Sequence, residues 1–145
     1  MSNVEDFLTQ TQEQQIIDAI RVAEKNTSGE IRVHLERNSE KDPLERAKEV
    51  FYFLKMDKTK NKNGVLFYVA VDDKKFSVLG DEGINNLVSE DFWYSIKDAV
   101  IQHFSTGSYA DGLKEGILAT GEKLKEFFPF QTNDNDELSN EISSG

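Results

Sequence analysis

The stretch Val65–Ile84, VLFYVAVDDKKFSVLGDEGI, decides the fold of this chain. Its first seven residues are apolar without interruption, and the β-branched and aromatic side chains among them predict a central strand that is covered on both faces. Asp72-Asp73 is typical of a turn, so Lys74–Leu79 is expected to return as an antiparallel partner. The segment GDEG at residues 80–83 either only joins this strand to a helix or presents carboxylates to a ligand.

A further strand is predicted before this hairpin. The segment GEIRVHLER at residues 29–37 alternates polar and apolar side chains, which indicates a half-buried strand over residues 30–36. Ile31, Val33 and Leu35 would face the core, and the charged side chains and His34 would face the other way. A helix joins this strand to the strand at residues 65–71, so the two are expected to run parallel through a right-handed crossover.

Four helices complete the predicted order of helix, strand, helix, strand, strand, helix, helix. They are expected from Thr11 with a capping box to Gln14, from Pro43 with Asp42 as N-cap, from Ser89 as N-cap, and from about Asp111 to Phe128. The buried stripe of the second helix is predicted at Leu44, Ala47, Val50, Phe51 and Leu54, and Trp93 and the ten phenylalanines are assigned to the core. Gly112, Gly116 and Thr120 are spaced by four residues and predict close packing of the last helix. The fold class is therefore α/β, an α/β/α sandwich with a small mixed sheet and helices on both faces.

Composition and charge narrow the class of protein. The 145 residues carry a net charge of -10, which disfavours nucleic acid and anionic membrane surfaces and favours divalent cations or a basic protein partner. There is no cysteine, so disulfides, thiolate catalysis and cysteine-ligated zinc are excluded. The N-terminus has no signal-peptide pattern and no apolar run approaches ~18 residues, so no membrane insertion and a cytoplasmic location are expected.

The chain is predicted to divide into one domain over residues 1–130 and a flexible acidic tail over residues 131–145. Within the tail, Leu138 and Ile142 are the side chains that could dock weakly on the domain.

Chain direction predicts an acidic site at one end of the sheet. Because the strand at residues 74–79 runs back, the acids that follow it are expected beside the starts of the other two strands, and the first turn of the third helix is expected to return there. Calcium takes roughly six to eight oxygen ligands, and magnesium fewer protein ligands with waters retained. The predicted cofactor is therefore a divalent metal, calcium before magnesium. Its predicted ligands are Glu30, Asn63, Asp81, Glu82 and Asp91.

A weaker acidic cluster is predicted at the opposite end, where Asp72 and Asp73 form the hairpin tip near Glu36 and Asp111 could join them. Turn chemistry alone favours Asp-Asp at a hairpin tip, and the helix dipole alone favours Asp91 near a helix start. Both clusters can therefore also be explained as ordinary solvated carboxylates in an acidic chain.

Motifs that would assign a catalytic mechanism are absent from the sequence. It has no Walker loop, dinucleotide-binding glycine motif, nucleophile elbow or His-Glu-x-x-His motif, so the catalytic residues are unknown. His34 and His103 are expected to be ordinary structural residues.

Four ordered segments resemble the TPM domain family. TSGEIRVHLE at residues 27–36 is similar to the family's Gly-Glu-led first strand, and LERAKEVFYFL at residues 44–54 resembles its Arg-Ala-x-x-x-Phe helix. NGVLFYVAVDDKKFSVLGDEGI at residues 63–84 is similar to its characteristic strand and hairpin. FSTGSYADGLKEGI at residues 104–117 matches its Phe-x-x-Gly-x-Tyr-x-x-Gly-x-x-x-Gly pattern. The resemblance covers about residues 10–128 and implies an α/β/α sandwich, in agreement with the predicted order.

The resemblance also implies an acidic cleft linked to divalent ions, acid phosphatase activity proposed for some plant relatives, and roles in assembly or repair of membrane complexes for others. Many bacterial relatives carry a signal peptide and a C-terminal membrane segment, neither of which is expected here. Gln102 stands where proline is common, and Asn85 stands near a position that is often acidic. Glu30, Asp81 and Asp91 carry over from the family as candidate ligands.

The leading hypothesis is a soluble TPM-type domain that binds divalent cations, with calcium expected. One alternative is a metal-assisted acid phosphatase, in which the ion would polarise a phosphoryl oxygen and Arg32 is the nearest arginine. The other is a protein-interaction or assembly module whose acidic surface or tail meets a basic partner. The sequence leaves open whether the protein is an enzyme.

Overall fold

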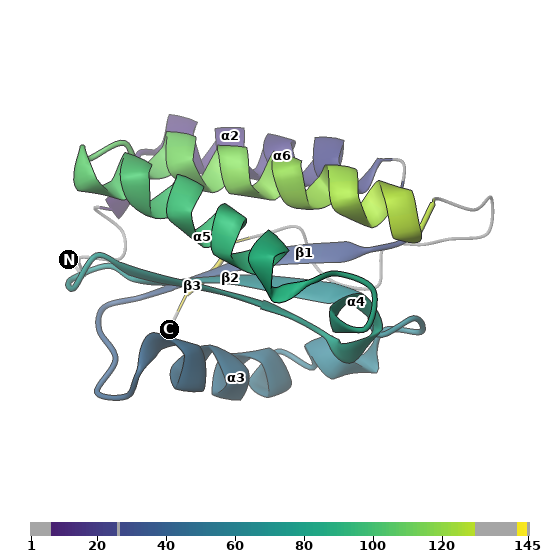
Figure 1. The fold of residues 1–145 in the computed structure, drawn as a ribbon. Helices are drawn as coiled ribbons and strands as arrows, with labels where there is room; N and C mark the ends of the chain where they lie inside the picture. Colours follow the sequence, from purple (N-terminus) through teal and green to yellow (C-terminus); the bar gives the residue numbers. More distant parts are fainter. Residues whose placement is uncertain (1–6, 26, 130–141, 145) are drawn as a thin grey trace.

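The computed structural model of the protein describes residues 7–25, 27–129 and 142–144. A four-stranded sheet lies at its centre, in the order β3-β2-β1-β4 (Figure 1). The strands are β1 Glu30–Glu36, β2 Gly64–Ala70, β3 Lys75–Gly80 and β4 Ser143–Ser144. β1 runs parallel to β2 and to β4, and β3 runs antiparallel to β2. The predicted mixed sheet and the predicted strand directions are confirmed.

Helices cover both faces of this sheet (Figure 1). One face carries α2 Gln10–Glu24, α5 Glu90–Ser105 and α6 Tyr109–Phe127, and the other carries α3 Pro43–Phe53. Two short elements, the 3-10 helix η1 Met56–Lys58 and the helix α4 Glu82–Asn85, lie before β2 and after β3. They therefore flank the end of the sheet at which β1 and β2 begin.

Two apolar cores follow from the alternation of side chains along the strands. The larger core lies on the side of α2, α5 and α6 and takes Ile31, Val33 and Leu35 from β1 and Val65, Phe67 and Val69 from β2. The smaller core lies under α3 and takes Leu66, Tyr68 and Ala70 from β2 with Ala47, Val50, Phe51 and Met56. All seven residues of β2 are buried, as the uninterrupted apolar run predicts.

Small residues bring α6 close to its neighbours. A Cβ at Gly116 would lie 2.8 Å from Val100 Cγ2 and 2.9 Å from Phe67 Cε2. These distances are well inside ordinary carbon–carbon contact at roughly 3.5–4.0 Å, so a side chain there would force the neighbours apart. Thr120, on the same stripe, is 1% exposed. The predicted close packing of this helix is confirmed.

Helix boundaries differ from the predictions at three places, one of which is α6, which begins at Tyr109 rather than at about Asp111. The first helix begins two residues earlier than predicted, because Thr9 rather than Thr11 forms the capping box, with Gln12: Gln12 N–H donates to Thr9 Oγ1 (3.1 Å) and Thr9 N–H donates to Gln12 Oε1 (2.9 Å). The segment predicted as a plain connection after β3 contains α4, since Asp81 accepts the N–H of Glu82 and starts a helical turn.

Two predictions of burial are wrong. Phe53 is 82% exposed at the end of α3, and Leu44 is 40% exposed at its start. The buried residues of α3 are Ala47, Val50 and Phe51, and Leu54 at its end packs against the same core.

The C-terminal residues that the structure describes add the fourth strand. Ser143 and Ser144 pair with His34 and Leu35, and Ile142 packs against the larger core, as expected for that side chain. Of the flexible tail predicted over residues 131–145, residues 131–141, which include Leu138, and residue 145 lie outside the described residues, so the division at residue 130 stays a prediction. None of the helices in the described ranges combines the length and apolar character needed to cross a membrane.

Candidate functional site at the end of the sheet

Three of the predicted ligands lie together at the end of the sheet where β1 and β2 begin. Glu30 pairs with Gly64 across the parallel strands, and its N–H donates to the Asn63 carbonyl (3.2 Å). The N–H of Asp81, just after β3, donates to the Gly64 carbonyl (2.9 Å). Glu30, Asn63 and Asp81 thus occupy three adjacent chain segments, in the positions that chain direction predicts.

Strand alternation places Glu30 and Asp81 on the α3 face, one on each side of Gly64. The neighbours of these acids, Ile31 and Gly80, face the opposite core, where a Cβ at Gly80 would lie 2.5 Å from a ring carbon of Trp93. Gly64 has no side chain to fill the space between the two acids. The main-chain carbonyl oxygen of Met56 lies over it, 3.3 Å from the position that a Cβ would take.

Two buried oxygen atoms at this end accept no hydrogen bond from the described part of the chain: Asn63 Oδ1 and Asp81 Oδ2. Asn63 is 0% exposed, and its Nδ2 donates to Ser28 Oγ (3.3 Å). Asp81 uses Oδ1 to cap α4, where it accepts the Glu82 N–H (2.8 Å). A buried polar atom without a partner costs about 1–3 kcal/mol, so both oxygens are poised to accept an external donor or a cation.

The loop that leads into β2 is held tightly against α4. A Cβ at Gly83 would lie 2.3 Å from the Asn61 carbonyl oxygen and 2.5 Å from that of Lys62. Lys62 itself has a φ of 52°, a left-handed conformation that is uncommon for a residue with a side chain. The loop therefore supplies main-chain oxygens beside Gly83, two residues after Asp81, in a fixed arrangement.

The other two predicted ligands, Glu82 and Asp91, are exposed in the first turns of α4 and α5. Across the described residues, no three or more His, Cys, Asp or Glu side chains form a group that could hold a metal ion. A cation at this end would therefore rest on at most two carboxylates, with amide and main-chain oxygens as its remaining ligands. Of the five predicted metal ligands, Glu30, Asn63 and Asp81 therefore remain as candidates.

Two of the three acids predicted to cluster at the opposite end lie near a base. Asp72 Oδ2 lies 3.6 Å from Arg37 Nε, and Asp111 Oδ1 lies 3.8 Å from Lys114 Nζ within α6. Asp73 is exposed in the hairpin turn. These are the contacts of surface carboxylates, and nothing in them favours a shared ion.

A buried ionic network between β1 and α3 was missed by the sequence reasoning. Glu36 accepts hydrogen bonds from Arg46 Nε (2.8 Å), from Arg46 Nη2 (3.0 Å) and from the Tyr68 hydroxyl. His34 joins it, with Nε2 3.3 Å from Glu36 Oε1 and Nδ1 2.9 Å from Ser143 Oγ. The strand was predicted to be half-buried, but His34 and Glu36 are only 4% and 6% exposed.

The charges in this network are fixed near neutral pH. Burial opposes ionisation of Glu36, but hydrogen bonds from Arg46, Tyr68 and His34 outweigh it and lower the pKa of Glu36 to about 2. Burial lowers the pKa of His34 against the opposing effect of Glu36, so the imidazole is neutral at pH 7. Burial, together with the bond to Glu36, raises the pKa of the Tyr68 hydroxyl. The network is therefore one ionised pair surrounded by neutral donors, which suits a stabilising role.

The layered fold and the four ordered sequence segments define the class to which the protein belongs. The family model described as TPM domain matches residues 1–123, so the chain belongs to the TPM domain family. The resemblance found in the sequence is confirmed. No curated protein matches the chain.

The solved structures that are similar to this chain include three that differ widely in sequence identity. The NMR structure of the BA42 protein from the psychrophilic bacterium Bizionia argentinensis is 54% identical, with 100% of each chain covered and a TM-score of 0.91. The N-terminal domain of a P. gingivalis protein is 24% identical over 83% of this chain and 78% of that one, with a TM-score of 0.69. The N-terminal domain of cg2496 from Corynebacterium glutamicum is 13% identical over 81% and 74%, with a TM-score of 0.60. The last two share the fold alone.

Proposed function

We propose that this TPM domain binds a divalent cation, calcium in preference to magnesium, at the end of the sheet that carries Glu30, Asn63 and Asp81. The observation that carries the proposal is the pair of buried oxygens, Asn63 Oδ1 and Asp81 Oδ2, which accept no hydrogen bond from the described residues. Each such atom opposes folding by roughly 1–3 kcal/mol, and a bound cation would remove that cost.

The types of oxygen at this end suit calcium. Calcium accepts carboxylate, amide and main-chain oxygens in a flexible shell at about 2.3–2.6 Å, whereas magnesium demands a near-ideal octahedron at about 2.0–2.1 Å and keeps several waters. Two carboxylates would neutralise a divalent charge, and the Met56 carbonyl over Gly64 is placed to add a neutral ligand. The net charge of -10 raises the local concentration of cations around the whole surface.

Calorimetric titration of the full chain with calcium and with magnesium tests the proposal. The test variant is the double substitution Glu30→Gln and Asp81→Asn, which removes both charges while asparagine keeps the N-cap of α4. The matched control is Glu122→Gln with Asp98→Asn, which removes two exposed charges elsewhere. We expect saturable calcium binding in the wild type and the control, and none in the test variant. Absence of heat with both ions, or an unchanged isotherm in the test variant, rejects the proposal.

Metal-assisted hydrolysis of a phosphomonoester is a second candidate, favoured by one observation. Arg32 follows Glu30 by two residues on the same face of β1, and its Nε is buried without a hydrogen-bond partner in the described chain. A guanidinium with a free donor beside a bound cation would suit a phosphoryl oxygen. Turnover of p-nitrophenyl phosphate that depends on calcium or magnesium and is lost in Arg32→Gln supports it. Turnover that persists in the Glu30→Gln, Asp81→Asn variant points to a contaminating enzyme instead.

The cytoplasmic location and the basic protein partner expected from the sequence stay predictions.

A further inference from the structure

The edge strand β3 borders a groove of about 410 Å³. One wall comes from the N-terminal half of α5, with Trp93 and Tyr94, and the other from Leu44 at the start of α3. Tyr94 is 61% exposed and Leu44 is 40% exposed. Large apolar side chains thus stand on both sides of an edge strand without covering it.

The main chain of β3 is open on this side. The Asp81 N–H bonds to Gly64, so in the antiparallel ladder Leu79, Ser77 and Lys75 bond to β2. The N–H and C=O groups of Phe76 and Val78 therefore point away from β2, and none of these four groups has a partner among the described residues. Proteins usually block such an edge with a charge, a proline or a bulge. β3 begins with the exposed Lys75, but the remaining segment, Phe76–Gly80, contains none of these.

The end of the groove is fixed by a short chain of hydrogen bonds. Asn85 Nδ2 donates to the Gly80 carbonyl (2.8 Å), and Trp93 Nε1 donates to Asn85 Oδ1 (2.9 Å). The indole is therefore held in place before any ligand arrives, which reduces the entropy lost on binding. The Asn85 amide also satisfies the last outward carbonyl of β3, so the carbonyls left open along this edge are those of Phe76 and Val78.

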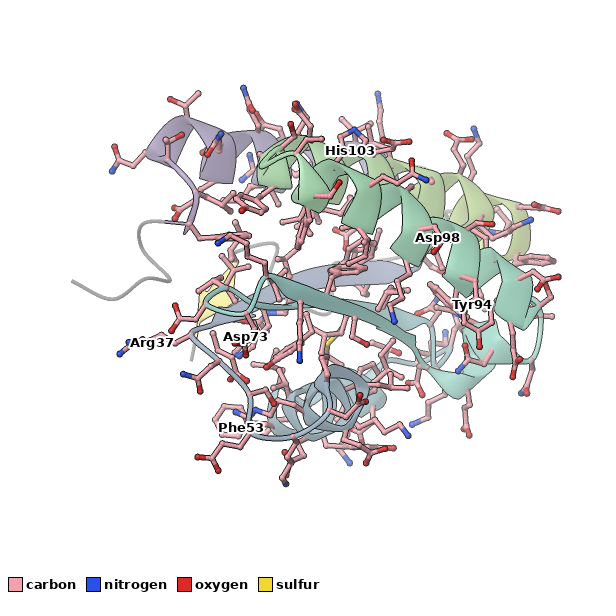
Figure 2. All side chains as sticks on the ribbon, turned by 60° about the vertical axis from the view of Figure 1, so that its left-hand side comes forward. Arg37, Phe53, Asp73, Tyr94, Asp98 and His103 are labelled. Atoms are coloured by element: carbon pink, nitrogen blue, oxygen red, sulfur yellow. The ribbon has the colours of Figure 1, made fainter. Side chains whose placement is uncertain are left out.

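Acidic residues border the groove on α5. Asp91 lies three residues before Tyr94 and Asp98 lies four residues after it, so both are neighbours of Tyr94 on the surface of the helix. Glu90 lines the groove itself. Figure 2 shows Tyr94 and Asp98 on α5 above the edge of the sheet. Lys97, which also lines the groove, is the one base among residues 90–98, against three acids. This border attracts a positively charged ligand.

The charge argues against the chain itself as the occupant. The segment at residues 131–145 contains four acids and no base, and a second copy of the chain carries the same net charge of -10. Both would be repelled by the acids of α5, whereas a basic segment from another protein would be attracted.

We propose that β3 binds an extended basic segment of a partner protein by strand addition. The segment pairs its main chain with Phe76 and Val78, places an apolar side chain against Trp93 and Leu44, and meets the α5 acids with lysine or arginine. In this mode of recognition the main-chain bonds give affinity and the alternate side chains give specificity. The inference does not depend on the proposed cation site.

The probe is a fluorescently labelled peptide of about eight residues, a typical strand length, that alternates lysine with valine and carries one central phenylalanine. We expect saturable binding to the full chain by fluorescence anisotropy. A peptide with glutamate in place of lysine should not bind. A peptide N-methylated on the residues of one edge should bind at least about tenfold more weakly, because it cannot complete the main-chain ladder.

Matched variants locate the binding surface. The test variant is Leu44→Ser with Tyr94→Ser, and the control is Leu118→Ser with Tyr52→Ser, whose side chains are exposed to nearly the same extent, 40% and 64%. We expect the test variant to weaken peptide binding by about tenfold or more and the control to leave it within about twofold. Neither variant alters a core residue, so both should remain folded.

Amide chemical shifts and hydrogen exchange read the mode of binding directly. On addition of the peptide, the Phe76 and Val78 amides should shift and become protected from exchange, while the amides of α2 should not change. The proposal is overturned if no labelled peptide binds, if the acidic or N-methylated peptide binds equally well, or if the protected amides lie outside β3.

Discussion

The network around Glu36 makes a quantitative prediction about stability. The pKa of Glu36 falls from 4.5 to about 2 on folding, a change of about 2.5 units, and each unit corresponds to about 1.4 kcal/mol. The ionised carboxylate therefore contributes about 3 kcal/mol to the free energy of unfolding at pH 7. Because the folded pKa lies below the unfolded value, this contribution is present above pH 4.5 and is lost as the pH falls toward 2.

The substitution Glu36→Gln removes this contribution and leaves Arg46 without its buried partner. We expect the free energy of unfolding at pH 7 to fall by about 3 kcal/mol, within the range of measured losses when one member of a buried pair is removed. Urea unfolding followed by fluorescence of the single tryptophan, Trp93, measures it. Between pH 4.5 and 2 the variant should lose about 3 kcal/mol less stability than its parent, because the titrating group is gone.

Two controls isolate the effect. Glu49→Gln removes the exposed partner of the same arginine, 3.5 Å from Arg46 Nη1, and should cost much less stability than Glu36→Gln because solvent screens an exposed ion pair. Parent and variant should both carry His34→Gln, because burial also lowers the pKa of His34 and adds a loss of stability below pH 6.5. A loss below about 1 kcal/mol at pH 7, with parallel pH profiles for parent and variant, would refute the reasoning.

Three further predictions concern packing and the proposed cation site. Gly116→Ala should lower the free energy of unfolding in urea by about 1–3 kcal/mol, because the new Cβ would lie 2.8 Å from Val100 Cγ2. The control Ser95→Ala, on the exposed face of α5, should change it by less than about 0.5 kcal/mol. Gly83→Ala should weaken calcium binding in calorimetry by about tenfold or more, because the new Cβ would displace the carbonyls of the loop before β2. Unchanged calcium affinity in this variant would show that the loop carbonyls are not part of the site. Calcium at about a hundred times its dissociation constant should raise the free energy of unfolding by about 2.7 kcal/mol in the wild type, and an equal rise in the Glu30→Gln, Asp81→Asn variant would contradict the assignment of ligands.

The strands could be predicted because their signals are local. The apolar run of β2 is long enough to require cover on both faces, and the Asp72-Asp73 turn follows it directly, so the hairpin and its direction need no tertiary information. The same directions place Glu30 beside Gly64 and Asp81 beside β2. The sequence therefore predicts which chain segments meet at this end of the sheet, and the role that we propose for them stays a prediction.

The buried network could not be predicted because it depends on where α3 crosses β1. The alternation of β1 is equally compatible with a polar face in water, and Arg46 reaches Glu36 only when a helix ten residues later lies over that face. Tyr68 on β2 pairs with His34 on β1, but within an apolar run nothing indicated that its hydroxyl would donate to a buried carboxylate. Likewise Asp91 was expected at the site, but its position depends on the angle at which α5 leaves α4.

The two ends of the polar face differ in how their carboxylates obtain positive charge. Glu36 receives donors on both oxygens from Arg46 within the fold, so that end has no need of an external ion. At the other end Asp81 has one oxygen satisfied by α4 and one without a donor. Lys62, one of four lysines between α3 and β2, donates to the Asp57 carbonyl. Asn63 leaves a second oxygen unsatisfied. In a chain with a net charge of -10, cations in solution are the abundant source of positive charge for these oxygens. The same strand thus supports a structural ion pair at one end and, on our proposal, a ligand site at the other, because α3 supplies an arginine to only one of them.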